Sequence, residues 1–393
     1  MKILHVNTND RGGAATACIR IHLGLLNRGI DSKILFLHRR KSELAQSGQF
    51  QTTGSLIQRF FRKVRQALTL DQKKIMRRFS EVEWFTMPVS PYDLTSHPLY
   101  KEADIIQLNW VSGFLDEPSF FRKNTKPVVW RMADLYNCGG GYHYEKGFPF
   151  QKLKKILLKN EMLRKRSLRG HNITFVPISN WVKNKADESD IIREFPKKVI
   201  HNGLDFSIWM PQDKTAARER FDLPKDQILI LMGADINRIE RKGMGNAVAA
   251  IEGLQRNDVT AVVFGNYTKQ LPQNFMNVGK IKDEATLVQL YSAADYFLMS
   301  SLEEAFGQVT IEALSCGVPV ISYPNGGSLD VIRPSFNGML ADDFSVEALT
   351  EALKLAMDGT FSSEEIIKDV QQRFNIQVRV EDYIALYKKL HQP

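Results

Sequence analysis

Residues 300–331 of the chain read SSLEEAFGQVTIEALSCGVPVISYPNGGSLDV, and this stretch decides the fold. An apolar strand ends where it begins, and after a polar loop the pattern predicts a helix over roughly 308–315. Gly317 stands where a helix C-cap glycine belongs, and Pro319 prevents the helix from continuing. A second apolar run, 318–322, then predicts another strand. Strand, loop, helix and strand in this order are typical of a parallel α/β sheet.

The same alternation extends through most of the chain. Short apolar runs bounded by turn signals predict strands at 2–6, 32–37, 105–108, 128–130, 174–178, 228–232, 259–264, 296–299 and 318–322. The segment 199–211 contains an Asn-Gly turn and ends at a proline, as a domain linker does. The last stretch, 378–390, carries apolar residues at helical spacing.

A chain of 393 residues is too long for one ordinary core. We therefore expect an α/β fold with two Rossmann-like domains that face each other across a cleft. The expected parts are an N-terminal domain at 1–200, a linker at 201–212, a C-terminal domain at 213–375 and a C-terminal crossover helix at 376–393.

Charge is divided unequally between the two halves. Residues 1–200 carry a net charge of +17 and residues 201–393 a net charge of −8, within a total of +9. The positive half predicts a partner that is anionic, such as nucleic acid, a membrane surface or a phosphorylated substrate. No apolar run approaches the roughly 18 residues of a membrane-spanning helix, and the start of the chain lacks the pattern of a signal peptide, so we expect a cytoplasmic protein.

Two glutamates in the opening stretch are candidates for ligand binding. Glu304 and Glu312 are eight positions apart, which is about 12 Å along a single helix. With one in the loop and one in the helix, they can flank an elongated ligand. The N–H groups of Gly307, Gln308 and Val309 lie between them, at a helix N-terminus that suits an anion such as pyrophosphate. The alternative is a solvated helix start whose acidic residues favour the helix dipole.

A basic loop, GADINRIERKGMG, follows the predicted strand at 228–232. Its cations, Arg238, Arg241 and Lys242, precede a helix and are well placed to bind pyrophosphate. A solvated basic loop is the alternative. In the first turn of the chain, Gly12 and Gly13 let the backbone approach a ligand closely, although a tight turn without a ligand explains them equally well.

A polar segment, 128–144, follows a strand of the first domain, and Asp134 comes just after that strand. His143 lies in the same segment, and His201 is the first residue of the expected linker.

These motifs together resemble family 4 of the glycosyltransferases, retaining enzymes with the GT-B fold. The resemblance rests on Glu304-Ala305-Phe306-Gly307, Glu312-Ala313-Leu314 and Gly317-Val318-Pro319-Val320. It implies that Glu304 contacts the donor sugar, that Glu312 contacts the ribose and that the backbone from Phe306 to Val309 contacts the phosphates.

The resemblance extends to three further places. It implies that Lys242, with Arg238 or Arg241, holds the diphosphate, because Ala234 stands where the family usually has an arginine. It also implies that Gly12 and Gly13 line the cleft. Residues 128–144 are similar to a Trp-x-x-His-Asp segment of the subgroup that builds bacterial surface polysaccharides. Trp130 and Asp134 match that segment, but Ala133 replaces its histidine, and His143 and His201 are the candidates to compensate.

Two segments rich in basic residues remain, 59–78 and 152–169. Each carries eight basic residues against one acidic residue. In the second, Leu153, Ile156, Leu157 and Leu163 form an apolar face among the lysines. A basic amphipathic helix of this kind binds an anionic membrane, and a solvated helix face is the alternative.

We therefore predict a metal-independent hexosyltransferase without a cofactor, for which Glu304, Lys242 and Asp134 are the catalytic candidates. Its donor is expected to be a UDP- or GDP-sugar and its acceptor a glycan, in a lipid-linked form, within polysaccharide biosynthesis; no nucleic acid is expected. The sequence contains no Asp-x-Asp, His-Glu-x-x-His or Walker motif. Two alternatives stay open, a nucleotide-sugar epimerase or hydrolase of the same fold and a non-catalytic nucleotide-sugar-binding protein.

Overall fold

The structure, a computed structural model, describes residues 1–41, 43–51, 74–79, 84–234, 240–267 and 270–391. The chain divides into two compact units. Unit 1 comprises Met1–Gly203 and Ile376–Pro393, and unit 2 comprises Leu204–Asn375. Residues 204–212, which we expected to form a linker, thus group with unit 2.

Unit 1 is built on a parallel sheet of six strands in the order β3-β2-β1-β4-β5-β6. This is the strand order of a Rossmann fold, in which the order reverses beside the first strand. The strands are β1 (Lys2–Asn9), β2 (Asp31–His38), β3 (Ser47–Gln49), β4 (Ile105–Leu108), β5 (Val128–Met132) and β6 (Ile173–Pro177).

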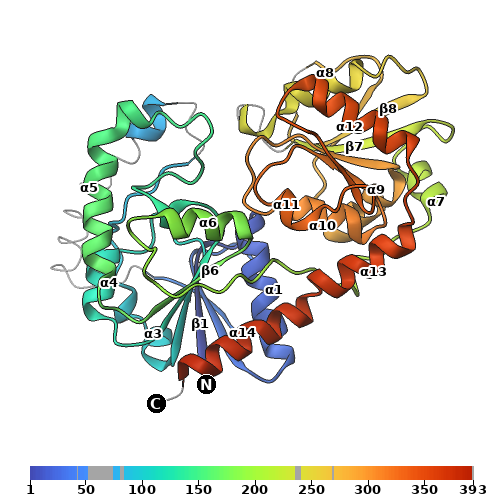
Figure 1. Ribbon diagram of the computed structural model, residues 1–393. Helices are drawn as coiled ribbons and strands as arrows, with labels where there is room; N and C mark the ends of the chain where they lie inside the picture. Colours follow the sequence, from blue (N-terminus) through green and yellow to red (C-terminus); the bar gives the residue numbers. More distant parts are fainter. Residues whose placement is uncertain (42, 52–73, 80–83, 235–239, 268–269, 392–393) are drawn as a thin grey trace. The chain divides into compact units, whose positions relative to one another are not determined.

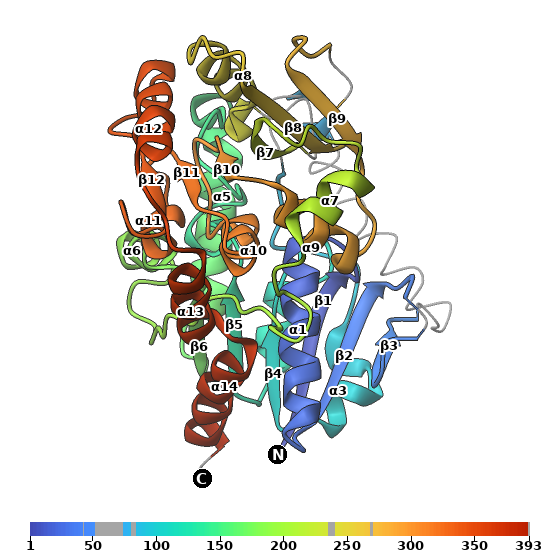
Figure 2. The ribbon, with the colours of Figure 1, turned by 90° about the vertical axis from the view of Figure 1, so that its right-hand side faces the viewer.

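Helices cover both faces of this sheet. They are α1 (Gly13–Asn27), α3 (Pro98–Glu102), α4 (Glu117–Lys123), α5 (Phe150–Leu168), α6 (Asn180–Glu188) and α14 (Ile376–His391), with short 3₁₀ turns at Leu94–Ser96 and Tyr136–Cys138. The last helix, α14, packs beside α1 over one face (Figures 1 and 2). There Val380 and Tyr387 bury their side chains against Ile21 of α1 and Ile105 of β4. On the opposite face, Phe121 of α4 stacks on Trp130 of β5.

Unit 2 repeats the same topology. Its six parallel strands have the order β12-β11-β10-β7-β8-β9. They are β7 (Ile228–Ala234), β8 (Val259–Gly265), β9 (Phe275–Gly279), β10 (Tyr296–Met299), β11 (Val320–Ser322) and β12 (Gly338–Leu340). Because β7, β10 and β11 are parallel neighbours, the loops that follow them meet at one edge of the sheet.

The helices of unit 2 lie on both sides of its sheet. They are α7 (Lys214–Arg220), α8 (Met244–Glu252), α9 (Glu284–Ala293), α10 (Gln308–Ser315), α11 (Ser328–Val331), α12 (Val346–Asp358) and α13 (Ser363–Phe374), with a 3₁₀ turn at Glu240–Lys242. Helices α8 and α12 cover one face and α9 and α10 the other (Figure 1). On the first face, Ala250 and Leu353 pack against Ile230 and Ile321 in one apolar core.

These observations confirm the predicted fold class, two Rossmann-like α/β domains with a C-terminal helix that returns to the first. All nine predicted strands are present, with ends that differ by at most a few residues. The edge strands β3, β9 and β12 were not predicted. Among the helices that the structure describes, we find none that is long and apolar enough to span a bilayer.

Candidate functional site

The candidate donor site is formed by loops at the carboxyl edge of the unit 2 sheet. One loop runs from β7 to α8, a second from β10 to α10 and a third from β11 to α11. Their backbones bond to one another directly: Leu302 N–H donates to the Arg241 carbonyl at 2.7 Å, and Gly327 N–H donates to the Glu304 carbonyl at 2.8 Å. The three loops therefore hold one another in place.

Two glycines make this close packing possible. Gly243 has a φ of 62°, and a Cβ there would lie 1.9 Å from the carbonyl oxygen of Ser300. A Cβ on Gly327 would lie 2.2 Å from the Cα of Phe306. Glycine is the residue that fits both positions, because any side chain would push the loops apart.

Three charged side chains converge where these loops meet. Lys242 Nζ lies 2.7 Å from Glu304 Oε2, and Arg241 Nη1 lies 3.6 Å from the same oxygen. Arg241 is almost fully buried and also donates to the Glu303 carbonyl at 2.5 Å. The Lys242 side chain is 41% exposed, so its ammonium is accessible to a ligand.

The protonation of Glu304 follows from these neighbours. Burial by itself would raise the pKa of Glu304, but the charges of Lys242 and Arg241 oppose it. Hydrogen bonds from Lys242 and from the Ala305 N–H act in the same direction, so the pKa lies below its ordinary value. Glu304 is thus an ionised carboxylate at neutral pH, able to accept hydrogen bonds from hydroxyl groups.

Helix α10 begins directly beside this cluster. Its N-cap, Gly307, has a φ of 76°, and no side chain of the described chain caps the helix. The first N–H groups, at Gln308 and Val309, are therefore available to an anion. The Gln308 amide is buried and has no hydrogen-bond partner among the described residues. A bound ligand would give that amide a partner, since buried polar groups are rarely left unpaired.

Two of the other predicted donor residues, Phe306 and Glu312, have buried side chains. The ring of Phe306 is buried and packs against Phe374, so that only the backbone of Phe306 is suited to contact a ligand. Glu312 is buried within α10, and the Tyr291 hydroxyl donates to its Oε2 at 3.5 Å. Arg238 lies outside the described residues. The predicted contacts of Glu312 with ribose and of Arg238 with diphosphate stay predictions.

Unit 1 carries the remaining predicted residues at the carboxyl edge of its own sheet. Gly12 and Gly13 are exposed at the start of α1, and the space beside their Cα atoms is open. The φ of Gly12 is 90°, and no described side chain caps this helix. The loop is thus also open to an anion, and the predicted role of Gly12 and Gly13 stays a prediction.

Asp134 lies at the end of a chain of hydrogen bonds. Its Oδ2 lies 2.6 Å from His143 Nδ1, and His143 Nε2 lies 2.8 Å from the Thr86 hydroxyl. The Thr86 hydroxyl bonds to the Ser112 hydroxyl, to which the Trp84 indole N–H donates at 2.7 Å. Of the two histidines that we considered as a replacement at Ala133, His143 is thus the one that contacts Asp134. Sequence reasoning did not include Trp84, Thr86 or Ser112.

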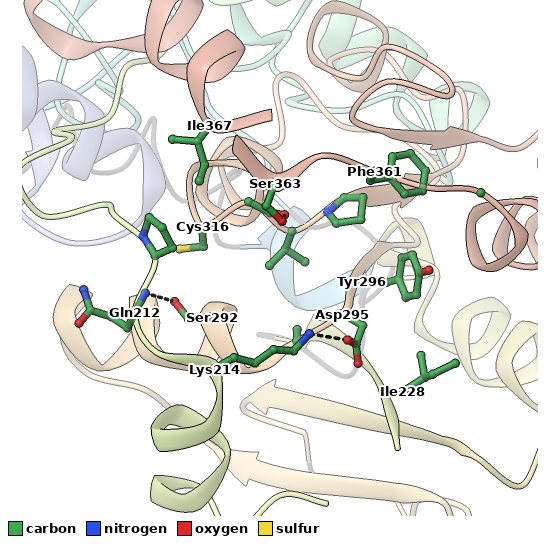
Figure 3. Close-up of a pocket in the computed structure, with 16 residues that line it drawn as sticks. Gln212, Lys214, Ile228, Ser292, Asp295, Tyr296, Cys316, Phe361, Ser363 and Ile367 are labelled. Carbon is green, nitrogen blue, oxygen red and sulfur yellow. Dashed lines mark hydrogen bonds and ion pairs between the residues drawn. The ribbon is translucent and has the colours of Figure 1, made fainter. Parts of the chain in front are cut away.

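A separate hollow of about 380 Å³ lies at the opposite edge of the unit 2 sheet (Figure 3). It is lined by Ile228 and Tyr296, the first residues of β7 and β10, and by Pro319, which directly precedes β11. Within it, Lys214 pairs with Asp295 at 2.5 Å. Its location separates it from the Lys242–Glu304 cluster, because the two ends of parallel strands lie at opposite edges of a sheet. Among the described residues, no group of three or more His, Cys, Asp or Glu is arranged to hold a metal ion.

Comparison with solved structures defines the class of fold. Sucrose-phosphate synthase from Thermosynechococcus elongatus is 17% identical, with a TM-score of 0.71, and the alignment covers 99% of each chain. The Anabaena protein HepE in complex with UDP is 17% identical, with a TM-score of 0.72, over 99% of this chain and 100% of that one. The fold is therefore the GT-B fold of glycosyltransferases.

Sequence comparison points to a family within that class. Residues 213–373, less than half of the chain, match the family described as glycosyl transferases group 1. A D-inositol 3-phosphate glycosyltransferase from Catenulispora acidiphila is 24% identical over 216 residues, or 49% of this chain and 52% of that protein. The match thus spans about half the length of this relative. Residues 213–373 are thus similar to the glycosyl transferases of group 1.

Proposed function

We propose that this chain is a retaining glycosyltransferase that moves a sugar from a UDP- or GDP-sugar to a hydroxyl of a glycan acceptor. The observation that carries the proposal is the cluster of Arg241, Lys242 and Glu304 beside the open N-terminus of α10. Cations and helix N–H groups suit a diphosphate, and an ionised carboxylate suits sugar hydroxyls. The structural neighbour HepE was solved with UDP, which supports a uridine nucleotide as the donor.

In the proposed reaction, the bond between the anomeric carbon and the leaving phosphate oxygen breaks. A bond from the same carbon to the acceptor oxygen forms on the same face of the sugar, through an oxocarbenium-like centre. The departing phosphate takes the proton of the acceptor hydroxyl. Lys242, Arg241 and the N–H groups of Gln308 and Val309 stabilise the negative charge that develops on the leaving diphosphate. Glu304 orients the donor sugar through its hydroxyl groups.

For the acceptor we propose a phosphorylated, lipid-linked glycan of a polysaccharide pathway. Exposed cations support this choice: Arg11 follows β1, and Arg40 and Lys41 follow β2. Asp10 ties the two loops together, because it accepts hydrogen bonds from the N–H groups of Arg40 and Lys41, the latter at 2.5 Å. These cations lie near the open start of α1 at Gly12 and Gly13. The relative from Catenulispora is named for an acceptor that also carries a phosphate.

We also propose that α5 contacts the inner face of an anionic membrane. The structure corrects one part of the expectation for 152–169: Leu153 and Leu157 are buried in the core and are not available to lipid. Met162, Leu158 and Phe150 are the exposed apolar residues of α5, with 68%, 49% and 36% of their surfaces accessible. They lie among exposed lysines, and this combination favours an interfacial helix. The second basic segment, 59–78, lies largely outside the described residues.

Sedimentation with liposomes tests the membrane contact. We expect the chain to sediment with phosphatidylglycerol vesicles and not with phosphatidylcholine vesicles. Replacing both Leu158 and Met162 by serine should weaken that binding. The matched control replaces Leu355, which is also 49% exposed but lies on α12 of unit 2. Equal binding by both variants would show that α5 is a solvated helix.

A donor screen followed by an activity assay tests the transferase. UDP-, GDP- and ADP-sugars are screened for an increase in melting temperature, and release of the nucleoside diphosphate is then followed with and without a glycan acceptor. A transferase predicts release that depends on the acceptor and a product whose anomeric configuration, measured by NMR, equals that of the donor. Release of the nucleoside diphosphate without an acceptor would instead identify a hydrolase, and conversion of the donor into an epimeric nucleotide sugar, seen by NMR, would identify an epimerase. Binding without any product would identify a non-catalytic binding protein.

A further inference from the structure

Trp84 is exposed in an unusual way for a tryptophan. Its side chain is 40% accessible, whereas Trp130 and Trp209 are almost completely buried. Its indole N–H nevertheless has a fixed partner, the Ser112 hydroxyl at 2.7 Å. One edge of the ring is thus anchored in the protein while much of its surface stays open to solvent. Tryptophan in such a place commonly serves binding, because its large apolar face is costly to leave in water.

A second tryptophan extends this surface. The ring of Trp110 lies 5.3 Å from that of Trp84, with the two planes inclined by 51°. Trp110 is half-buried and follows β4, so it lies at the carboxyl edge of the unit 1 sheet. Ligands of doubly wound sheets bind at this edge. The ring of Trp110 also lies near that of His143, with ring centres 5.9 Å apart.

The anchoring hydrogen bonds form a continuous chain. The Trp84 N–H can only donate, so the Ser112 hydroxyl accepts from it, and Ser112 shares a further hydrogen bond with the Thr86 hydroxyl. Thr86 bonds in turn to His143 Nε2, and His143 Nδ1 bonds to Asp134 Oδ2. The orientation of the Trp84 ring is therefore coupled to the Asp134 carboxylate, and such chains are stronger than isolated bonds.

We propose that the faces of Trp84 and Trp110 form a platform on which a pyranose ring of the acceptor stacks, and this inference rests on the proposed transferase function. The face of an indole ring carries partial negative charge, whereas the C–H groups on one face of a pyranose carry partial positive charge. A nucleobase also stacks on tryptophan, but the cations and helix N-terminus suited to its diphosphate are in unit 2.

Fluorine NMR of the full chain, labelled with fluorotryptophan, tests the platform. The five tryptophans give five signals, and the Trp84→Phe and Trp110→Phe variants assign the two that matter. The probes are the methyl glycosides of glucose, mannose and galactose, with sorbitol as a polyol that has no ring. We expect at least one glycoside to shift the Trp84 and Trp110 signals in a saturable way. Sorbitol should shift neither signal, and no glycoside should shift the signals of the buried Trp130 and Trp209.

Matched variants separate stacking from folding. Trp84→Leu, which removes the ring, should weaken binding of that glycoside about tenfold, as the loss of an aromatic contact predicts. Trp84→Phe keeps a ring face and should weaken it less. Phe344→Leu removes an exposed ring in unit 2 and should leave the affinity unchanged. Should Trp84→Leu fail to fold, the shifts of the unsubstituted chain still decide the question.

The outcomes for the platform and for the transferase are distinguishable. If none of the glycosides shifts the Trp84 signal, or if Trp84→Leu binds as well as the unsubstituted chain, the platform is overturned. Binding of UDP and its sugars, measured by calorimetry, is unaffected by that result. Conversely, glycoside binding at Trp84 without any binding of nucleotide sugars would leave the platform standing and overturn the transferase.

Discussion

The ammonium of Lys242 lies 2.7 Å from Oε2 of Glu304, and the two residues come from different loops at one edge of the unit 2 sheet. An anion next to this pair meets a cation that is already held in place by a carboxylate. The cost of ordering the lysine side chain, up to about 2 kcal/mol, is then partly met before a ligand binds. The fold therefore fixes the positions of the Lys242 ammonium and the Glu304 carboxylate before a ligand binds.

Replacing Lys242 by alanine should weaken binding of UDP or GDP by about 1.5–3 kcal/mol, the value of a hydrogen bond to a charged group. Isothermal calorimetry measures the loss. Lys214→Ala is the matched control, because Lys214 also pairs with a carboxylate in unit 2 but at the opposite edge of the sheet (Figure 3). Nucleotide affinity that is equal in the two variants would remove Lys242 from the site.

A methyl group at Gly243 should destabilise unit 2 strongly. Gly243→Ala places a Cβ 1.9 Å from the Ser300 carbonyl and adds about 1–2 kcal/mol of left-handed backbone strain. Two positions later, a Cβ on Gly245 meets no atom within 4 Å, and Gly245 lies in α8. Gly245→Ala should therefore stabilise the helix by about 0.5–1 kcal/mol. Urea denaturation compares the two, and equal midpoints would contradict the loop packing described above.

Among the basic residues of α5, Arg164 should contribute most to the stability of unit 1. It is completely buried, its Nε lies 3.1 Å from Glu117 Oε2, and its Nη1 donates to the Gly139 carbonyl at 2.7 Å. Arg164→Ala leaves Glu117 buried without its partner and should cost about 3–5 kcal/mol of unfolding free energy. Arg166→Ala, at an exposed position of the same helix, should change it by less than about 0.5 kcal/mol.

Acidification should weaken unit 1 below about pH 6.5. His5 is fully buried in β1, where burial, followed by the nearby His22, lowers its pKa well below the ordinary value of 6.5. Below that pH the unfolded chain binds a proton that the folded chain cannot, so stability falls by up to about 1.4 kcal/mol per pH unit. The pKa of His22 is lowered by burial as well, although its bond to the Ala45 carbonyl opposes the shift.

Hydrogen exchange of the β1 amides between about pH 7.5 and pH 5.5 measures this effect on the free energy of opening. His5→Leu should flatten the pH dependence. His38→Gln, at an exposed position at the end of β2, should not alter it. A pH dependence that survives in His5→Leu would assign the acid sensitivity to other groups.

Sequence patterns were most informative where structure is local. The Glu304–Gly307 loop and the start of α10 are consecutive in the chain, so turn glycines and helix periodicity sufficed to predict them. The central strands were equally clear, because they are continuous apolar runs. The edge strands β3 and β12 are only three residues long and include small or polar residues, so they give no such signal.

Contacts distant in sequence could not be predicted in this way. The hydrogen-bond chain from Trp84 to Asp134 joins three separate segments, and its members form no common motif. For the apolar residues of α5 the sequence does show a pattern, but the pattern does not identify what packs against it. Helical periodicity correctly indicates that Leu153 and Leu157 share a face, but it does not reveal whether core or lipid covers that face. Burial in unit 1 answers the question for these two residues.

The position of α14 has a consequence for the order in which the chain folds during synthesis. All of unit 2 leaves the ribosome before α14, yet α14 covers Ile21 and Ile105 of unit 1. Unit 2 can therefore close its core first, although its segment comes second. The nascent N-terminal unit meanwhile keeps an apolar face uncovered, which makes it a target for chaperones until the last helix arrives.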